Sequence, residues 1–322
     1  MVWCAVDDDI QPASYLESCV DDDVELSFGI GDGEDAAIEA LSGADGLFTT
    51  SRVPVTETVL EDVPDLDLVA KIGTGLDSID LDAAHQEGVT VVYTPGLNAR
   101  SVAEHAVSLL LAVNRNVLLG HRRLEEGGWR DTMPTSKSVT DTTIGIVGFG
   151  NVGQRIAGLL SGFQADVLAH DPYVHPIDTD LTGATLVGLS ELLESADAVI
   201  ISAERTPETE KLIDAQALET MKDDATLVNS ARGPIVDQDA LIDALERDAI
   251  GGAGLDVFET EPLPPDSPLH EFDNVVLTPH MGASSLRARK AAIKTLAETA
   301  CDFFAGEELN DRFVAVRGDG LR

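Results

Sequence analysis

The chain has 322 residues, of which 43% are hydrophobic, so it is long enough to form two ordinary domains with apolar cores. It carries 58 acidic and 21 basic residues, a formal net charge of −37, and this excess of negative charge argues against a nucleic-acid partner. Because such a chain repels itself unless salt screens its charges, we interpret the composition as that of a halophilic protein.

The sequence lacks the signals of a membrane or secreted protein. No apolar run reaches the roughly 18 residues that a membrane-spanning helix needs. The N-terminal residues, MVWCAVDDDI, carry no basic region of the kind that opens a signal peptide. We therefore expect no membrane association and predict a cytoplasmic protein.

The first block of the chain alternates strand-like and helix-like segments. Its strand-like runs are apolar and bounded by Gly, Pro or Asp; they cover residues 2–6, 24–28, 45–50, 66–73 and 89–94. A helix-like segment, 34–43, lies between two of these runs. This alternation predicts βαβ units and a parallel sheet. One long helix is predicted next, over 101–127, with Asn98 or Ser101 as its N-cap.

A second block repeats the same alternation. Its strand-like runs cover residues 142–149, 165–170, 196–202, 225–230, 251–258 and 274–280. An amphipathic helix is predicted at the end of the chain, over 285–308. The two blocks together predict an α/β protein with two doubly wound parallel sheets.

A glycine motif opens the second block. The sequence TTIGIVGFGNVGQ carries Gly148, Gly150 and Gly153 between a predicted strand and a predicted helix, VGQRIAGLLSGF. In a dinucleotide-binding turn the first glycine allows the sharp bend, the second lets backbone N–H groups reach a pyrophosphate, and the third lets the helix pack closely. The N-terminus of the helix, at Asn151 and Val152, adds partial positive charge.

An acidic residue stands where the ribose of a dinucleotide is expected. Asp171 ends the next predicted strand, 18 residues beyond Gly153, close to the spacing of about 20 residues in such motifs. The glycines and Asp171 together predict that the second block binds a dinucleotide. Since about 140 residues precede the motif, a separate α/β domain is expected before it.

Seven stretches distributed over the whole chain resemble the D-isomer-specific 2-hydroxyacid dehydrogenases. They are KIGTGLDSID (71–80), TPGLNARSVAEHA (94–106), GIVGFGNVGQ (145–154), HDPY (170–173), LVNSARGPIVDQDAL (227–241), GLDVFETEPL (254–263) and TPHMGASS (278–285). The resemblance implies a flavodoxin-like substrate domain built from residues 1–97 and 284–322. It also implies a Rossmann cofactor domain inserted between them, over 98–283.

The resemblance implies a reaction and a catalytic trio. The reaction is the reversible, stereospecific reduction of a 2-oxo acid to a D-2-hydroxy acid with NAD(P)H. His280 is expected to be the general acid and base, Glu261 to orient it, and Arg232 to bind the substrate carboxylate and carbonyl. The imidazole exchanges protons near neutral pH, and the planar guanidinium matches a carboxylate.

The resemblance also implies the residues that contact the substrate and the cofactor. The substrate carboxylate is expected at backbone amides of Gly73, Thr74 and Gly75, followed by the apolar Leu76. The expected cofactor contacts are Gly148, Gly150, Asn151, Val152, Gly153, His170, Asp171, Arg205, Ser230, Ala231, Asp256 and Gly282. No metal ligands are expected, and His105 is interpreted as a structural histidine.

One loop departs from the family pattern. Where the family usually has His–x–Pro–Leu–Thr–Pro–Glu–Thr, this chain has SAERTPET, with Ser202 in the place of the histidine and Glu204–Arg205 in the place of Pro–Leu. Asp171 favours NAD by repelling a 2′-phosphate, whereas Arg205 and His170 or His175 favour NADP by neutralising one. The choice between NAD and NADP stays open.

Three alternatives accompany this interpretation. Formate dehydrogenases have a glutamine where this chain has Glu261. A non-enzymatic corepressor that senses nicotinamide would keep the glycines but need an exposed protein-binding groove. A phosphoglycerate dehydrogenase falls within the same family; longer members carry a regulatory domain, for which we expect no room because the chain stops at Arg322.

A homodimer through the cofactor domain is the expected assembly. The segment 116–131, with Trp129 in a glycine-flanked loop, resembles the arm that makes this contact in the family.

Overall fold

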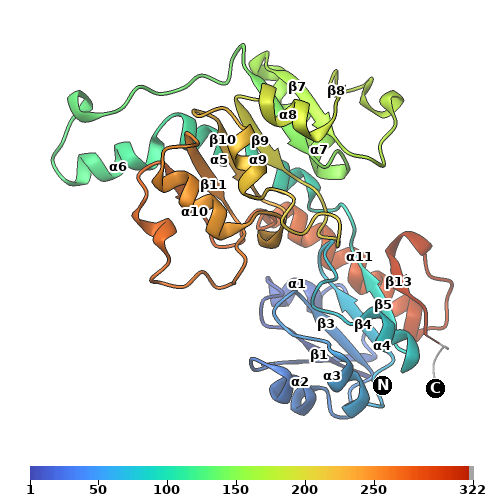
Figure 1. Ribbon diagram of the computed structural model, residues 1–322. Helices are drawn as coiled ribbons and strands as arrows, with labels where there is room; N and C mark the ends of the chain where they lie inside the picture. Colours follow the sequence, from blue (N-terminus) through green and yellow to red (C-terminus); the bar gives the residue numbers. More distant parts are fainter. Residues whose placement is uncertain (319–322) are drawn as a thin grey trace. The chain divides into compact units, whose positions relative to one another are not determined.

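The computed structural model describes residues 1–318. The chain divides into two compact units, one formed by Met1–Asn98 with the chain from Ala283 onward, and the other by Ala99–Gly282. Each boundary lies one residue from the boundary that the sequence suggests. We call them the outer unit and the inserted unit and describe each by itself (Figure 1).

The outer unit is built on a six-stranded sheet in the order β13-β5-β4-β3-β1-β2. Its strands are β1 (Val2–Val6), β2 (Val24–Phe28), β3 (Gly46–Thr49), β4 (Leu68–Lys71), β5 (Thr90–Tyr93) and β13 (Val314–Val316). Strands β1 to β5 run parallel, and β13 adds an antiparallel edge beside β5. The buried strands are apolar on both faces, as parallel sheets covered by helices require.

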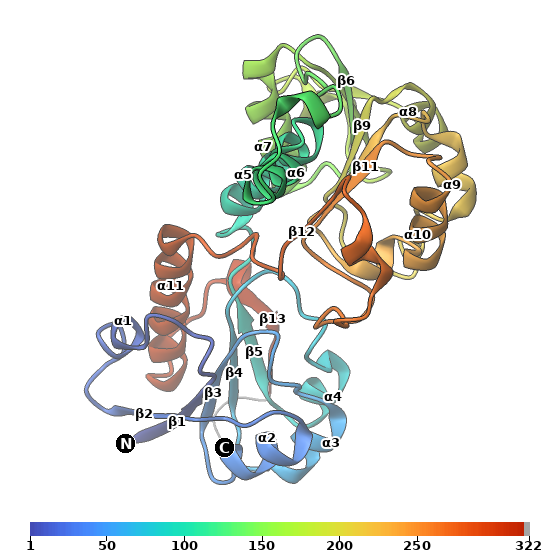
Figure 2. The ribbon, with the colours of Figure 1, turned by 90° about the vertical axis from the view of Figure 1, so that its left-hand side faces the viewer.

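Helices cover both faces of this sheet. They are α1 (Ala13–Glu17), α2 (Glu34–Leu41), α3 (Glu57–Asp62), α4 (Leu81–Gln86) and α11 (Leu286–Phe304). Side chains of α2, α3 and α4 pack in one apolar cluster with Ala5 and Val69, whereas those of α1 and α11 pack in another with Val6 and Leu68. Figure 2 shows α1 and α11 on the opposite side of the strands from α3 and α4. Residues from the two ends of the chain therefore share one core.

The inserted unit has a seven-stranded, fully parallel sheet in the order β12-β11-β10-β9-β6-β7-β8. Its strands are β6 (Thr143–Val147), β7 (Asp166–His170), β8 (Thr185–Leu186), β9 (Ala198–Ile201), β10 (Thr226–Asn229), β11 (Gly252–Leu255) and β12 (Val275–Leu277). The chain order reverses between β6 and β9, and a doubly wound sheet binds its ligand at such a reversal.

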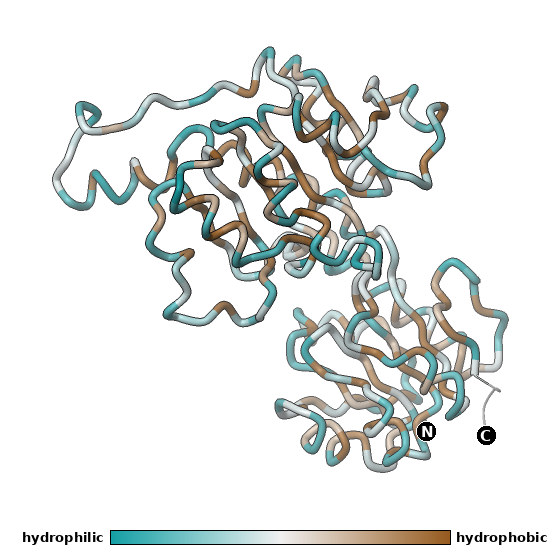
Figure 3. Tube along the Cα trace, viewed as in Figure 1, coloured by the Kyte–Doolittle hydropathy of each residue, from teal (hydrophilic) through white to brown (hydrophobic). Residues whose placement is uncertain are grey.

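Two layers of helices enclose the second sheet: α5 (Ala99–Asn114) and α7 (Asn151–Leu160), and α8 (Leu189–Ser195), α9 (Ala215–Thr220) and α10 (Gln238–Glu246). Helix α6 (Val117–Glu125) follows α5 and, among the described residues, contributes none to the apolar clusters of either layer. Helices α5 and α7 share one apolar cluster, and α8, α9 and α10 share the other. Figure 3 shows apolar residues along the strands and polar residues at the turns. The prediction of two doubly wound α/β sheets is confirmed.

The single long helix predicted over 101–127 is wrong in one respect. The chain forms α5 and α6 instead, bent by 56°, because Asn116 adopts a left-handed conformation with φ of 52°. Of the two predicted N-caps, Asn98 directly precedes α5, which begins at Ala99, whereas Ser101 lies in the first turn of the helix and is wrong. The final helix α11 starts where expected, with Ser285 accepting from the Ala288 N–H, and ends four residues early at Phe304.

Among the described residues no single helix has the length and apolar character to cross a bilayer. Helices α5 and α6 meet that criterion only when their bent pair is counted together.

Candidate active site

The loop after β6 has the backbone geometry of a phosphate-binding turn. Gly148 has φ of +87°, and a Cβ there would lie 2.4 Å from the Ala203 nitrogen. A Cβ on Gly153 would lie 2.3 Å from the Gly148 carbonyl oxygen, so α7 packs too closely on the loop for any side chain. A Cβ on Gly150 would meet nothing within 4 Å, which leaves open space in front of the α7 N-terminus. Asn151 and Val152 form the first turn of that helix.

Asp171 is fixed beside this turn at the end of β7. Its Oδ2 accepts a hydrogen bond from the Phe149 N–H at 2.8 Å, and its Oδ1 accepts one from the Tyr173 N–H at 3.0 Å. The preceding His170 uses its Nδ1 toward the Val187 carbonyl at 3.1 Å. Asp171 therefore has a set orientation at the β6–β7 edge, with lone pairs left on both oxygens.

The loop after β9 closes the other side of the turn. Ser202, which replaces the family histidine, donates from its hydroxyl to the Gly148 carbonyl at 2.6 Å. Arg205 forms a two-point ion pair with Glu210, with Nε–Oε2 at 2.9 Å and Nη2–Oε1 at 3.3 Å. His175 caps a short 3₁₀ helix after β7 by accepting from the Ile177 N–H. Arg205 and His175, which were expected to neutralise a 2′-phosphate, are thus already bonded to neighbouring protein groups.

The exits of three adjacent strands carry the expected catalytic residues. Arg232 follows β10, Glu261 follows β11, and His280 follows β12. Because parallel strands end at one edge of the sheet, residues far apart in the sequence come together there. His280 Nδ1 lies 2.7 Å from Glu261 Oε2, and Glu261 Oε1 accepts from the Phe258 N–H at 3.0 Å.

Glu261 is ionised beside His280. Burial alone raises the pKa of Glu261, but the hydrogen bonds from His280 and the Phe258 N–H, with the positive charges of His280 and Arg232, hold it below its ordinary value. An ionised carboxylate only accepts hydrogen bonds, so the hydrogen between the two side chains belongs to His280 Nδ1. The other ring nitrogen, Nε2, is then the atom that can exchange a proton with a ligand.

The loop that carries Arg232 is organised by Asn229. The Asn229 side chain donates to the Arg232 carbonyl at 2.9 Å and accepts from the Ala231 N–H at 3.1 Å. Gly233 follows, where a Cβ would lie 1.8 Å from the Phe258 carbonyl oxygen. The exits of β10 and β11 are therefore pressed together, which brings the Arg232 charge near Glu261. In the described part of the chain, the buried Ser230 hydroxyl has no hydrogen-bond partner.

Asp256 is a buried anchor at the exit of β11, only 1% exposed. Its carboxylate accepts from the N–H groups of Met281 and Gly282 at 2.9 and 2.8 Å, and from the Thr278 hydroxyl at 2.6 Å. His105 Nε2 lies 3.1 Å from the same carboxylate. The expected cofactor contacts Asp256 and Gly282 are thus joined to each other.

In the outer unit, the loop after β4 holds Gly73, Thr74, Gly75 and Leu76. Gly73 has φ of +113°, and its N–H donates to the Thr94 hydroxyl at 2.8 Å. The Thr74 hydroxyl accepts from the Gly96 N–H at 3.1 Å. These two hydrogen bonds join the exits of β4 and β5. Because the Gly73 N–H is already used, the expected binding of a carboxylate by this loop depends on the N–H groups of Thr74 and Gly75.

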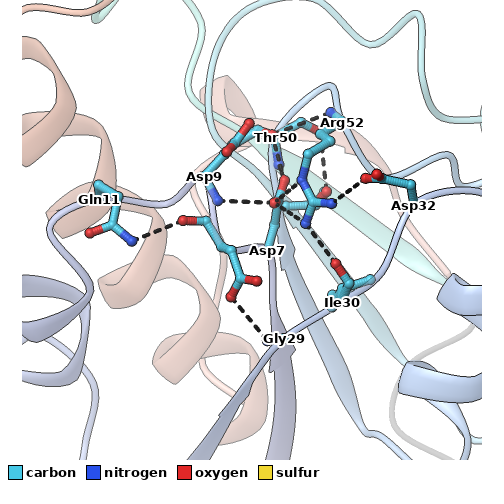
Figure 4. Close-up of polar contacts among 10 residues, drawn as sticks. Asp7, Asp9, Gln11, Gly29, Ile30, Asp32, Thr50 and Arg52 are labelled. Carbon is cyan, nitrogen blue, oxygen red and sulfur yellow. Dashed lines mark hydrogen bonds and ion pairs between the residues drawn. The ribbon is translucent and has the colours of Figure 1, made fainter.

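A second polar cluster occupies the strand reversal of the outer unit, at the exits of β1 and β3 (Figure 4). The fully buried Asp7 accepts from Arg52 Nε at 2.9 Å and from the Thr50 N–H at 3.0 Å. Arg52 also donates to Asp32 and to the Ile30 carbonyl, each at 2.9 Å. These groups satisfy one another, so the cluster is structural.

Sequence reasoning missed the supporting residues of this site. Asn229, Thr278 and Ser101 carry no chemistry by themselves, and the partners of Thr278 and Ser101, Asp256 and Gly282, are distant in the sequence. The N-terminal Asn of the stretch NSARG was the available signal, since Asn side chains often bond the backbone two residues on. No group of three or more His, Cys, Asp or Glu side chains in residues 1–318 is arranged to hold a metal.

Comparison with known proteins gives one family. The model of the D-isomer specific 2-hydroxyacid dehydrogenase, NAD binding domain, matches residues 107–282. The chain is 41% identical over 290 residues to the D-3-phosphoglycerate dehydrogenase of Mycobacterium bovis, covering 90% of this chain and 55% of that protein. It therefore spans about half the length of that relative.

Two further proteins match along nearly their whole length. The glyoxylate reductase of Korarchaeum cryptofilum is 37% identical over 293 residues, with 88% of each chain covered. The TT0316 protein from Thermus thermophilus has a solved structure that matches with a TM-score of 0.90 at 31% identity, covering 98% of this chain and 100% of that one.

Proposed function

Because the chain belongs to the D-isomer-specific 2-hydroxyacid dehydrogenase family, we propose that it reversibly reduces a 2-oxo acid to a D-2-hydroxy acid with a nicotinamide cofactor. The observation that carries this proposal is the His280–Glu261 pair at 2.7 Å, with Arg232 on the neighbouring strand exit. A proton donor, a carboxylate that orients it and a cation are the groups that carbonyl reduction needs.

The inserted unit fits a dinucleotide. The space in front of Gly150 and the α7 N-terminus suits a pyrophosphate, and the unpartnered Ser230 hydroxyl offers a polar contact at the exit of β10. Asp171 accepts hydrogen bonds from ribose hydroxyls in this proposal. A bound nicotinamide supplies the hydride that reduces C2 of the substrate.

The chain's own residues handle the charge and the proton. Arg232 binds the substrate carboxylate and polarises the carbonyl with its planar guanidinium. His280 gives the proton on Nε2 to the carbonyl oxygen during reduction and takes it back during oxidation. Glu261 accepts from Nδ1 and so fixes the ring orientation through both directions.

We propose that NAD is preferred over NADP. Asp171 places a negative charge at the end of β7, and Glu210 occupies the guanidinium of Arg205 through two contacts. Replacing Glu210 by Gln should free Arg205 and tighten NADPH binding several-fold while NADH binding stays unchanged. Fluorescence titration of both cofactors measures this, with Glu208→Gln in the same loop as the matched control. Unchanged NADPH affinity in Glu210→Gln argues against a role for this pair.

The substrate belongs to the 2-oxo acids in this proposal, with two chemical classes supported by the relatives. The D-3-phosphoglycerate dehydrogenase relatives support a phosphorylated 2-oxo acid, and the glyoxylate reductase supports a short one without phosphate.

Oxidation of the reduced cofactor, followed by absorbance in molar KCl, tests the proposal. Glyoxylate, pyruvate, hydroxypyruvate and phosphohydroxypyruvate are compared as substrates. His280→Ala should lower turnover by about 10²–10⁴-fold, whereas His85→Ala, at an exposed histidine of α4, should not. Tight NADH binding without turnover of any substrate would instead support a nicotinamide-sensing protein.

We also propose a homodimer formed through α6 and the loop after it. Leu124 and Trp129 are 58% and 65% exposed there, large values for apolar side chains. In a chain of net charge −37 this segment is balanced, with Arg122, Arg123 and Arg130 against three acidic residues, so two copies can meet there with less repulsion than on the acidic remainder of the surface. Light scattering in molar salt should give twice the 34.1-kDa chain mass, and Trp129→Glu should give the monomer.

The working environment is proposed to be a cytoplasm rich in salt. The support is compositional, because the acidic excess of the chain is distributed along its whole length and needs screening.

A further inference from the structure

The segment that carries His280 has an unusual backbone. His280 has φ of 48°, a left-handed conformation that residues other than glycine rarely adopt. Its N–H donates to the Asp256 carbonyl at 2.8 Å. A residue held in this way depends on neighbouring contacts that keep the strained conformation in place.

Those contacts converge on the Asp256 carboxylate. It accepts from the N–H groups of Met281 and Gly282, the two residues that follow His280. Only a correctly oriented carboxylate can bind both amides, one with each oxygen. The orientation of Asp256 therefore sets the path of residues 280–282.

Two side chains fix the orientation of Asp256. The Thr278 hydroxyl donates to its Oδ1 at 2.6 Å, and His105 Nε2 lies 3.1 Å from Oδ1 and 3.0 Å from the Thr278 oxygen. The pKa of Asp256 is below its ordinary value, because hydrogen bonds from His105, Thr278 and two amides outweigh its burial. An ionised Asp256 only accepts, so His105 Nε2 carries the hydrogen.

Helix α5 supplies a further contact from the same face. Ser101 lies one helical turn before His105, and its hydroxyl donates to the Gly282 carbonyl at 2.7 Å. Both polar backbone groups of Gly282 are thereby engaged. A side chain on Gly282 would also come within 3.0 Å of Asp256 Oδ2.

We propose that His105 and Thr278 are positioning residues for His280, acting through Asp256. They do not contact the reacting atoms; they hold the carboxylate that holds the backbone of His280, and so keep the imidazole on Glu261. The proposal rests on the proposed role of His280 as proton donor. It predicts that losing either hydrogen-bond donor slows the chemical step rather than weakening substrate binding.

Paired variants separate the donor from the packing. Thr278→Val and His105→Leu remove a donor at similar size, whereas Thr278→Ser and His105→Gln keep one. We expect the first pair to lower kcat about 10–100-fold with the substrate KM within about threefold, and the second pair to recover most of the loss. A solvent deuterium isotope effect on kcat should increase in the slowed variants.

Matched controls come from hydroxyls outside the network. Ser108 lies on α5 and donates to the Glu104 carbonyl at 2.8 Å, and Thr299 donates to the Thr295 carbonyl at 2.8 Å within α11. Ser108→Ala and Thr299→Val should keep the parent kcat. Wild-type kcat in a folded Thr278→Val or His105→Leu, or an equal loss in Thr278→Ser, overturns the positioning role.

A second measurement does not depend on turnover. Hydrogen exchange of the peptide containing residues 278–285 reports the amides of His280, Met281 and Gly282 directly. We expect exchange there to accelerate at least tenfold in Thr278→Val and His105→Leu and to stay unchanged in Ser108→Ala. Unchanged exchange overturns the network. A parent protein that lacks turnover but shows this exchange pattern overturns the proposed function alone.

Discussion

Each of the three glycines in the loop after β6 is a glycine for a different physical reason. Gly148 needs its positive φ and the close approach of Ala203, and Gly153 allows α7 to lie against the Gly148 carbonyl. Gly150 has empty space around its missing side chain, so packing does not require a glycine there; the proposed pyrophosphate site gives a reason for one.

Gly153 gives a sharp test at this scale. In Gly153→Ala the new methyl group, 2.3 Å from the Gly148 carbonyl oxygen, must push α7 away from the loop. We expect a loss of about 1–3 kcal/mol in unfolding free energy and weaker NADH binding. Denaturant titration and fluorescence titration measure these.

The control for this prediction lies five residues further along α7. A Cβ on Gly158 meets nothing within 4 Å, so Gly158→Ala should stabilise the helix by about 0.5–1 kcal/mol and leave NADH binding unchanged. Equal effects of the two substitutions would contradict the packing role of Gly153.

Individual site residues divide into those that local motifs identify and those that they do not. Arg232, Glu261 and His280 stand in recognisable stretches, so the sequence alone proposes them. The pairing of His105 with Asp256 joins residues 151 positions apart, and no local pattern indicates it. A histidine on an apolar helix therefore gave only the expectation of a structural role.

At the scale of elements, the strand exits decide where polar groups meet. In the inserted unit they gather the candidate catalytic residues, whereas in the outer unit the exits of β1 and β3 gather Asp7, Thr50 and Arg52. The polar groups of this second set form hydrogen bonds with one another and so join the two strands (Figure 4).

Asp7 should therefore matter for stability and not for turnover. Asp7→Asn removes a buried charge from Arg52, and we expect a loss of about 3 kcal/mol at neutral pH. Asp32→Asn, at the exposed partner of the same arginine, should cost less than about 1 kcal/mol. Denaturant titrations of the two variants and the parent measure both values.

The same variant has a pH dependence with a definite sign. Burial raises the pKa of Asp7, but the hydrogen bonds from Thr50, the Asp9 N–H and Arg52 outweigh burial and hold this pKa below its ordinary value. A depressed carboxyl pKa stabilises the fold above the unfolded-state pKa, and this contribution is lost as pH falls through the folded-state pKa. The gap between parent and Asp7→Asn should shrink below about pH 4; a gap that stays constant to about pH 2 would contradict the assignment.

The sequence predicted most elements but not the short or long-range ones. Alternation and glycine punctuation located the strands that the helices bury. The strands β8 and β13, of two and three residues, have too little pattern to be recognised, and β13 pairs with β5 more than 200 residues earlier in the chain. The break at Asn116 was missed because only three polar residues, 114–116, separate the apolar positions of α5 from those that resume at Val117 in α6, and no Gly or Pro marks the end of the first helix.

For the whole molecule, we expect the net charge to control how stability depends on salt concentration. The net charge of −37 on a 34.1-kDa chain opposes compaction when the Debye length is about 10 Å, at 0.1 M salt. Raising KCl to about 2 M should increase the thermal midpoint by at least about 5 °C, roughly 2 kcal/mol for units of this size. A scan in sucrose separates this effect from general exclusion of solutes, and a midpoint that falls with KCl would exclude the halophilic interpretation.

The interrupted course of the chain has a consequence for biosynthesis. A ribosome finishes the inserted unit, a continuous stretch from Ala99 to Gly282, before it makes α11. Until then the face of the outer sheet that carries Val6 and Leu68 lacks Ile293, Leu296 and Ala300, which cover it in the finished protein. The nascent chain should therefore hold one folded unit and one incomplete unit, in which one face of the sheet stays exposed until α11 has been synthesised.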